Sequence, residues 1–257
     1  PVTAANMTAA ILFLAERAET LIGIWGIGLA PTGERDPFGL RRAALGLISA
    51  FEQLTAGGFL PIQQNGPLTL EGLLQAAAQT FEPAALAPTT VAEVQAFVLE
   101  RLRNQLITQL DRNAVEAVLA IAPPLHQILA RVQAAATFAQ GPDAASLAAA
   151  NKRIGNLLKK SEAGLQPLNQ ALLTEPAEQA LAKTITELQP LAQQHLDAGD
   201  YQGAMATLAQ ARAPVDAFFN DIMVMADDLA VRNNRLALLA QLHGLMNQVA
   251  DISRLAA

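Results

Sequence analysis

Apolar residues recur along this chain at three- and four-residue spacing, and this periodicity does most to limit the folds open to it. The stretch "VAEVQAFVLERLRNQL" places its apolar residues on one helical stripe, made by Val91, Val94, Phe97 or Val98, and Leu102. Runs of alternating β-branched residues are hard to find, while the dominant residues, alanine, leucine and glutamine, favour helix. We therefore predict an all-α chain with essentially no sheet.

Length and composition narrow the class further. With 257 residues, 52% of them hydrophobic, the chain can bury a substantial core in one large domain or two smaller ones. It has no cysteine, which excludes disulfides and thiolate metal sites and is compatible with the cytoplasm, where we expect it to reside. The apolar N-terminal stretch is broken by Glu16, Arg17 and Glu19, so we expect no membrane span. Because the chain begins at Pro1, without an initiator methionine, we expect a fragment.

Breaks in composition predict three regions. Residues 1–56 read as two helices around a turn, in which Asp36 and Pro37 suit the N-cap and first position of the second helix. The stretch "TAGGFLPIQQNGPLTL" predicts a boundary, after which residues 57–141 form a linker and connecting helices. In the last region, 142–257, we predict a long helix that starts at Gly141–Pro142–Asp143 and others at about 176–198, 200–212, 214–225 and 228–255.

Charge is unevenly distributed. The formal net charge of −6 argues against a surface that coats nucleic acid generally. Residues 187–228 hold seven acidic residues and one basic residue, Arg212, whereas residues 152–160 hold four basic residues and no acidic one. Since RNA phosphates repel carboxylates, we expect the acidic region to turn away from any RNA or to meet protein.

The helix "LAAANKRIGNLLKK" carries the strongest basic signal. At about 100° per residue, five polar residues share an arc of roughly 120° while the apolar side chains point the other way. This pattern fits either an ordinary solvated face or a strip that contacts phosphates, the crowded like charges favouring the second. The five residues are Lys152, Arg153, Asn156, Lys159 and Lys160.

A second basic cluster, "RNNR", opens the last predicted helix. Arg232 and Arg235 are one turn apart, and Asp228 lies four residues before Arg232, which favours a salt bridge. Salt bridging at a helix end and contact with a charged partner both remain open. The predicted buried stripe of this helix consists of Leu236, Leu239, Leu242, Met246, Val249 and Ile252.

Signatures of catalysis are missing. None of the three histidines, His126, His195 and His243, has a second ligand at metal-binding spacing on a shared helix. The "GIWGIG" stretch lacks the spacing and the preceding strand of a dinucleotide loop, and neither a phosphate loop nor a nucleophile elbow occurs. We expect no catalytic residue, no metal and no cofactor in this chain alone.

Three long blocks resemble the beta subunit of the bacterial two-subunit (alpha/beta) glycine–tRNA ligase. They are "LAERAETLIGIWGIGLAPTGERDPFGLRRAALGLI", "LAAANKRIGNLLKK" and "PVDAFFNDIMVMADDLAVRNNRLALLAQLHGLMNQVADISRL", and the resemblance covers nearly the whole chain. It implies the C-terminal part of that subunit. Residues 1–56 would end an HD-like helical domain, a helical linker would follow, and residues 142–257 would form a DALR-type anticodon-binding helical bundle.

The resemblance also implies partners and a role. The chain would bind tRNA-Gly, and the separate alpha subunit, which binds ATP and Mg²⁺ in this family, would charge that tRNA with glycine. We expect no DNA partner. Basic side chains would hold phosphates and amides would bond unstacked anticodon bases. The expected tRNA-binding residues are Asn151, Lys152, Arg153, Asn156, Lys159, Lys160, Arg232, Asn233, Asn234 and Arg235.

Other residues leave alternatives open. Arg35, Arg41 and Arg42 would contact tRNA or the alpha subunit, or else pair with Glu34 and Asp36. The chain carries Leu229, Ala230, Val231 and Arg232 where the family has Asp-Ala-Leu-Arg. Glu16 stands where many members have Asp, a position that would bind metal in HD phosphohydrolases, but the histidine–aspartate pair of those enzymes is not visible, so we infer no metal site. The rival hypotheses are a helical protein-interaction scaffold without RNA binding and a degenerate HD hydrolase.

Overall fold

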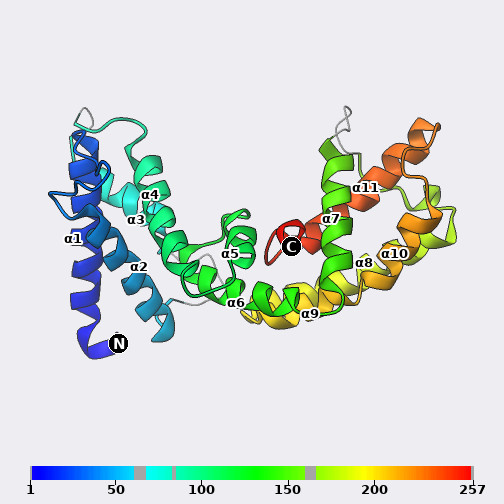
Figure 1. Ribbon diagram of the computed structural model, residues 1–257, viewed down its shortest axis with the longest axis horizontal. Coiled ribbons are helices and arrows are strands. Elements are labelled where there is room, and N and C mark those ends of the chain that lie inside the picture. The colour runs from blue at the N-terminus through cyan, green and yellow to red at the C-terminus, as the bar shows by residue number, and fades with distance from the viewer. Residues whose placement is uncertain (1, 61–67, 83–84, 160–165, 256–257) are drawn as a thin grey trace. The chain divides into compact units, whose positions relative to one another are not determined.

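The computed structural model describes residues 2–60, 68–82, 85–159 and 166–255. All regular elements in these ranges are helices (Figure 1), and the only β-pairing there is an isolated bridge between Thr32 and Arg35. The predicted all-α class is therefore confirmed.

The chain forms two compact units. Unit 1 comprises Pro1–Gln109 and Pro123–Ile128, and unit 2 comprises Leu110–Ala122 and Leu129–Ala257. All three changes of unit along the chain fall inside the region 57–141 that the sequence marks as connecting. The finer division into three regions stays a prediction.

Unit 1 packs its helices around one core. The helix α1 contacts α2, α3 and α4, and α4 also contacts α2 and α3. The helices before and after "TAGGFLPIQQNGPLTL" thus belong to the same unit, so this stretch connects helices within unit 1. Residues 61–67 of the stretch lie outside the described ranges. The elements are η1 (Ala4–Asn6), α1 (Met7–Gly26), α2 (Leu40–Ala56), α3 (Leu70–Ala78), α4 (Thr90–Leu106) and η2 (Leu125–Gln127).

The apolar periodicity of α4 has the consequence predicted from it. Val94, Phe97, Val98 and Leu102 are buried, and Val91 is half-buried at the start of the stripe. Burial of a side chain of this size contributes about 1.5–3 kcal/mol relative to leaving it exposed. The stripe therefore joins α4 to the core of unit 1.

The start of α2 differs from the prediction by three residues. The helix begins at Leu40, and its N-cap is Gly39 in the left-handed region, with a φ of 68°. Asp36 still caps the helix, because its carboxylate accepts the backbone amides of Leu40 and Arg41 at 2.8 and 2.9 Å. The left-handed turn that glycine allows brings this carboxylate over the helix end, while Pro37 stays in the turn.

Two glycines of "GIWGIG" serve packing. A Cβ atom on Gly26 would lie 2.2 Å from Cδ2 of Leu86, and one on Gly23 would lie 2.8 Å from Cζ of Phe81. Their bare backbone lets the segment after α3 approach α1 closely. Close packing therefore accounts for these two glycines, and no nucleotide-binding loop is needed to explain them.

Unit 2 is built around α7 and α8. The helix α7 contacts α10, α11 and η4, while α8 contacts α9, α10 and α11. Figure 1 shows α7 in green beside the orange-to-red α11. The elements are α5 (Arg112–Leu119), α6 (Ile128–Ala139), α7 (Ala144–Lys159), η3 (Gln170–Leu172), α8 (Pro176–Asp197), α9 (Tyr201–Ala209), α10 (Arg212–Asp221), α11 (Leu229–Met246) and η4 (Ile252–Arg254).

The last helix ends earlier than predicted. It stops at Met246, where the side-chain amide of Asn247 donates to the carbonyl of His243 at 2.8 Å and accepts the amide of Ile252 at 3.2 Å. These two bonds turn the chain into η4. All six residues of the predicted stripe are nevertheless buried, because the turn keeps Val249 and Ile252 against unit 2.

Candidate nucleic-acid interface

The predicted polar face of α7 is exposed. Lys152, Arg153, Asn156 and Lys159 lie on the surface, while Ile154 is fully buried. Within the described ranges neither Lys152 nor Lys159 has an ion-pair partner. Lys160, the fifth member of the predicted stripe, lies outside the described residues. These lysines are therefore available to an anionic partner.

Part of this face forms one wall of an open groove in unit 2. The groove has a volume of about 800 Å³. Three cations, Lys152, Lys159 and Arg254, line it together with one carboxylate, Asp251, so its lining carries net positive charge. The other lining residues are Ala120, Ile121, Asn151, Gly155, Asn156, Leu158, His243, Asn247 and Ser253.

The carboxylate of Asp251 is already engaged. One oxygen accepts the Ser253 hydroxyl at 2.6 Å, and the other accepts Nε of Arg254 at 3.1 Å. Sharing these donors reduces the field that Asp251 presents to the groove. Within the described ranges, no carboxylate pairs with the two groove lysines of α7, Lys152 and Lys159.

Arg153 does not line the groove. It lies on the other edge of the polar face of α7, with its guanidinium carbon 4.3 Å from the ring centroid of Phe219 on α10. Such a cation–π contact stabilises by about 0.5–1 kcal/mol at an exposed site. The predicted basic stripe is therefore divided between the groove and a packing contact.

The prediction that Asn151 bonds an RNA base conflicts with its burial. Its side chain is only 1% exposed. Its amide forms a reciprocal pair with that of Asn247, with distances of 2.8 and 3.1 Å. The pair joins α7 to the end of α11, and no amide proton or oxygen of Asn151 is left at the surface.

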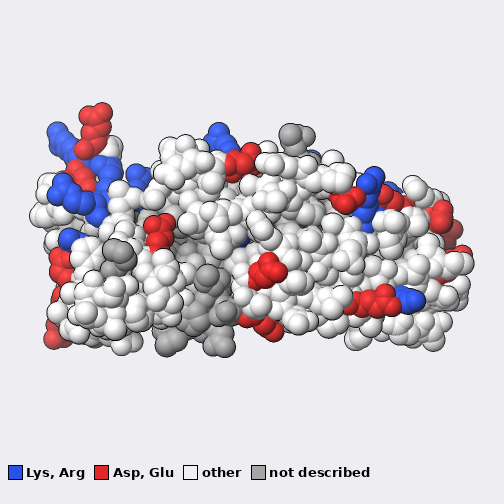
Figure 2. All heavy atoms as spheres, turned by 90° about the horizontal axis from the view of Figure 1, so that it is seen from below, with Lys and Arg blue, Asp and Glu red and all other residues white. Residues whose placement is uncertain are grey.

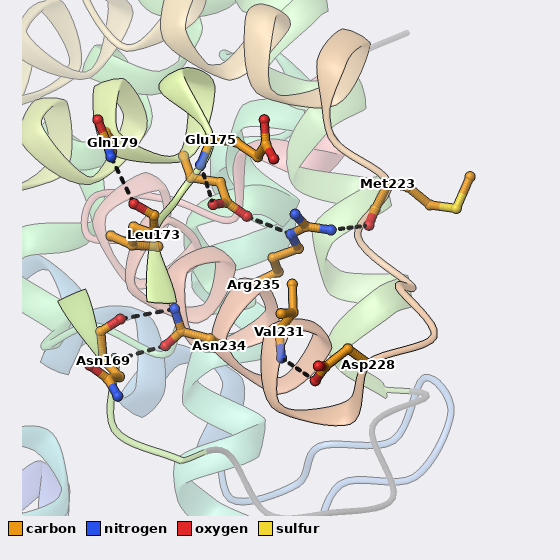
Figure 3. Close-up of polar contacts among 10 residues, drawn as sticks. Asn169, Leu173, Glu175, Gln179, Met223, Asp228, Val231, Asn234 and Arg235 are labelled. Atoms are coloured by element: carbon orange, nitrogen blue, oxygen red, sulfur yellow. Dashed lines mark hydrogen bonds and ion pairs between the residues drawn. The ribbon is translucent and has the colours of Figure 1, made fainter. Parts of the chain in front are cut away.

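Asn234 and Arg235 of α11 also face inward, as Figure 3 shows. Asn234, 5% exposed, accepts the amide of Asn169 at 2.7 Å and donates to its carbonyl at 3.0 Å. Arg235 donates to the Glu178 carboxylate at 2.5 Å and to the Met223 carbonyl at 2.8 Å. Both side chains hold unit 2 together, which corrects their assignment as RNA contacts.

Arg232 and Asn233 remain candidate contacts. Both are half-buried and lie within the first five residues of α11. The predicted pairing of Asp228 with Arg232 is not among the ion pairs of the described residues. Asp228 instead caps the helix, accepting the amides of Ala230 and Val231 at 2.7 and 3.1 Å.

Two of the three arginines that the sequence singles out in unit 1 form no ion pair within the described ranges. Arg35 and Arg42 are exposed and form no ion pair within the described ranges, and Arg41 donates to the carbonyl of Gly33. The expected pairing with Glu34 or Asp36 is therefore not seen, since Asp36 accepts backbone amides. Basic side chains gather on unit 1 at the left of Figure 2, intermixed with acidic ones.

His243 is the one histidine that lines the groove, and we predict that it is neutral at physiological pH. Burial lowers its pKa below the ordinary 6.5, and the carboxylate of Asp251 partly opposes this by raising it. The folded chain thus holds this proton less readily than the unfolded chain. The stability that neutral His243 allows is complete above pH 6.5, the ordinary pKa, and is lost as the pH falls through the lower pKa of the folded chain.

Titration by NMR of the histidine ring protons should show His243 with a midpoint below 6.5. Asp251→Asn should move that midpoint further down, because it removes a carboxylate that favours the protonated ring. A midpoint at or above 6.5, or an upward move in the variant, would contradict this account.

The described residues hold neither a cluster of metal ligands nor a helix that could span a membrane. No three histidine, aspartate or glutamate side chains among them are grouped as metal ligands would be. None of their helices combines the length and the apolar character needed to cross a membrane.

Comparison with known proteins covers both units. A family described as glycyl-tRNA synthetase beta subunit matches residues 2–120, and one described as DALR anticodon binding domain matches residues 147–252. The second match includes most of α7 and all of α11, which line the groove.

Individual relatives agree with these family matches. The chain is 47% identical over 255 residues to a glycine–tRNA ligase beta subunit of Methylobacillus flagellatus, covering 98% of this chain and 35% of the relative. It is 46% identical to that of Ralstonia nicotianae, with coverage of 97% and 35%, and 44% identical to that of Neisseria gonorrhoeae, with coverage of 96% and 34%. The chain thus spans about a third of the length of these relatives.

Proposed function

Since this chain belongs to the family of glycine–tRNA ligase beta subunits, we propose that it binds tRNA-Gly through unit 2 and so supports its charging with glycine. The observation that carries the proposal is the pair of exposed lysines, Lys152 and Lys159, which line the groove of a DALR-type domain and form no ion pair within the described ranges. RNA is held chiefly through its phosphates, which lysines of this kind bind.

The groove adds a place for bases. Sequence-specific recognition of RNA targets unstacked bases of single-stranded loops, and the anticodon is such a segment. Asn156 lies between the two lysines on the wall of α7 and offers an amide donor and acceptor. Phosphate contacts and a base-reading amide thus lie on one face.

The partners of this chain are tRNA-Gly and the separate alpha subunit. ATP and Mg²⁺ are bound by the separate alpha subunit, which carries out the chemistry, while this chain holds the tRNA. Both subunits act in the cytoplasm. Neither DNA nor a membrane is a partner in this scheme.

Replacing both lysines by glutamine tests the proposal. We expect the Lys152→Gln/Lys159→Gln variant to bind a tRNA-Gly transcript roughly tenfold more weakly at about 0.1 M salt. The slope of log affinity against log salt should fall by about one to two, because two phosphate contacts no longer release counterions. Fluorescence anisotropy titrations across a salt series measure both quantities.

Lys183→Gln is the matched control. Lys183 is a lysine of unit 2 on α8, 76% exposed, and it lies 3.8 Å from Glu187. This variant should keep the affinity and the slope of the unmodified chain. If the groove variant and the control lost affinity and salt slope to the same extent, or if neither lost any, the groove face would not be the tRNA-binding face.

A protein-interaction scaffold is the second candidate. It is supported by two exposed apolar side chains on α1 of unit 1, Ile11 and Leu12, at 56% and 66% exposure. The scaffold predicts tight binding to the alpha subunit together with tRNA affinity no greater than for a neutral control protein. A pull-down and the anisotropy assay, run on the same preparation, separate the two functions.

A further inference from the structure

The groove on α7 is also lined by His243, a polar side chain to which the proposed phosphate contacts assign no role. His243 is half-buried there, and its imidazole nitrogens have no hydrogen-bond partner among the described residues. A neutral imidazole offers one donor and one acceptor, the pairing pattern that a nucleobase edge also presents. A phosphate, by contrast, is held best by full positive charge.

The space in front of His243 exists because residue 155 is glycine. A Cβ atom built on Gly155 would have only one atom of the described residues within 4 Å outside its own helix, Nε2 of His243 at 3.7 Å. Any larger side chain at this position would project into the groove. The glycine thus keeps the approach to the imidazole open.

Charge and apolar surface are arranged around this opening. Lys152, Lys159 and Arg254 line the groove as cations, while Ile121 and Leu158 line it as apolar side chains. A nucleotide has the same division, with a charged phosphate and a flat, largely apolar base face. The groove volume of about 800 Å³ exceeds what a single base needs.

We propose that this groove receives one unstacked base of a single-stranded RNA segment, whose edge is read by His243 while the lysines hold the neighbouring phosphates. The proposal rests on the proposed function, since it names the subsite through which unit 2 would bind tRNA. It assigns a specificity-determining role to His243 and an access role to Gly155.

The test uses tRNA-Gly transcripts in which each anticodon-loop base in turn is replaced by an abasic site. For the unmodified chain, we expect one position at which losing the base weakens binding roughly tenfold, the magnitude typical of a stacked or bonded base. Gly155→Phe fills the groove, so it should bind the intact and abasic transcripts with affinities within about twofold at that position.

Gly244→Phe is the matched control. Gly244 is also a helical glycine of unit 2, next in sequence to His243, but a Cβ atom there would meet nothing within 4 Å. It should keep the tenfold difference. His243→Ala adds a second variant that makes no new bulk, and it should bind all four bases at the sensitive position equally while keeping its salt dependence.

The outcomes separate the two proposals. No binding of tRNA-Gly by the unmodified chain would overturn the proposed function. Binding with no sensitive loop position, or a sensitive position that both Gly155→Phe and His243→Ala leave unchanged, would overturn the base subsite alone. Circular dichroism of each variant shows whether a lost difference reflects the groove or unfolding.

Discussion

Arg235→Ala should destabilise unit 2 by about 3–5 kcal/mol, the usual cost of leaving one partner of a buried ion pair alone. The side chain of Glu178 is 1% exposed and that of Arg235 is 12% exposed, so water cannot replace the lost guanidinium. The second carboxylate oxygen of Glu178 already accepts the amide of Glu175 and cannot offset the loss. Urea unfolding followed by circular dichroism measures the change.

Arg232→Ala is the control for this prediction. Arg232 lies one turn earlier on the same helix, and it forms no ion pair within the described ranges. Its loss should cost less than about 1 kcal/mol, as for ordinary surface positions. Similar losses for the two variants would contradict the assignment of Arg235 to the interior.

A second pair of variants tests whether charge burial is the cause. Replacing both partners, as in Glu178→Met/Arg235→Met, should recover most of the stability that Arg235→Ala loses, because no uncompensated charge remains. Recovery of less than half would point to packing as the larger contribution. Under conditions where Arg235→Ala stays folded, its tRNA affinity should equal that of the unmodified chain.

Asn247→Ala should destabilise unit 2 by about 2–4 kcal/mol, from two or more lost hydrogen bonds and an unsatisfied buried amide. Asn247 bonds Asn151 twice, caps α11 through the His243 carbonyl and accepts the amide of Ile252. Its loss leaves the Asn151 amide buried without this partner and removes the turn into η4. Thermal and urea unfolding report the loss.

Two comparisons make this prediction specific. Asn233→Ala removes another half-buried asparagine of α11, whose side chain makes no hydrogen bond within the described ranges, and should change stability by less than about 0.5 kcal/mol. Adding Asn151→Ala to Asn247→Ala should cost little more, because the pair is already broken. Additive losses would show that the two amides act independently.

The spacing of apolar residues along the sequence was sufficient to predict the all-α fold class and which side of a single helix is buried. The three- and four-residue spacing that buries Val94, Val98 and Leu102 also predicts the buried stripe of α11 and the exposed face of α7. These inferences need only the geometry of one helix, in which residues three and four apart share a side. The family resemblance likewise rests on contiguous blocks, and both family matches agree with it.

Helix ends were predicted less well, for a local reason. The side chains that end or begin a helix do so from outside it: Asp36 caps α2 across a left-handed Gly39, and Asn247 stops α11. A cap depends on the path of the backbone beyond the helix, which periodicity does not describe. Apolar spacing continued past Met246, so the pattern extended the helix too far.

Which polar side chains face a partner was decided by tertiary structure alone. Asn151, Asn234 and Arg235 look like surface groups in sequence, but they bond residues 96, 65 and 57 positions away. The same packing places Arg153 over the ring of Phe219. It also brings Lys152 and Lys159 to the groove that Arg254 lines. The sequence by itself determined the helices and their apolar faces, because each depends on neighbours three or four residues away. Only the tertiary structure decided which polar groups are buried, because their partners come from other helices whose packing sets the distances.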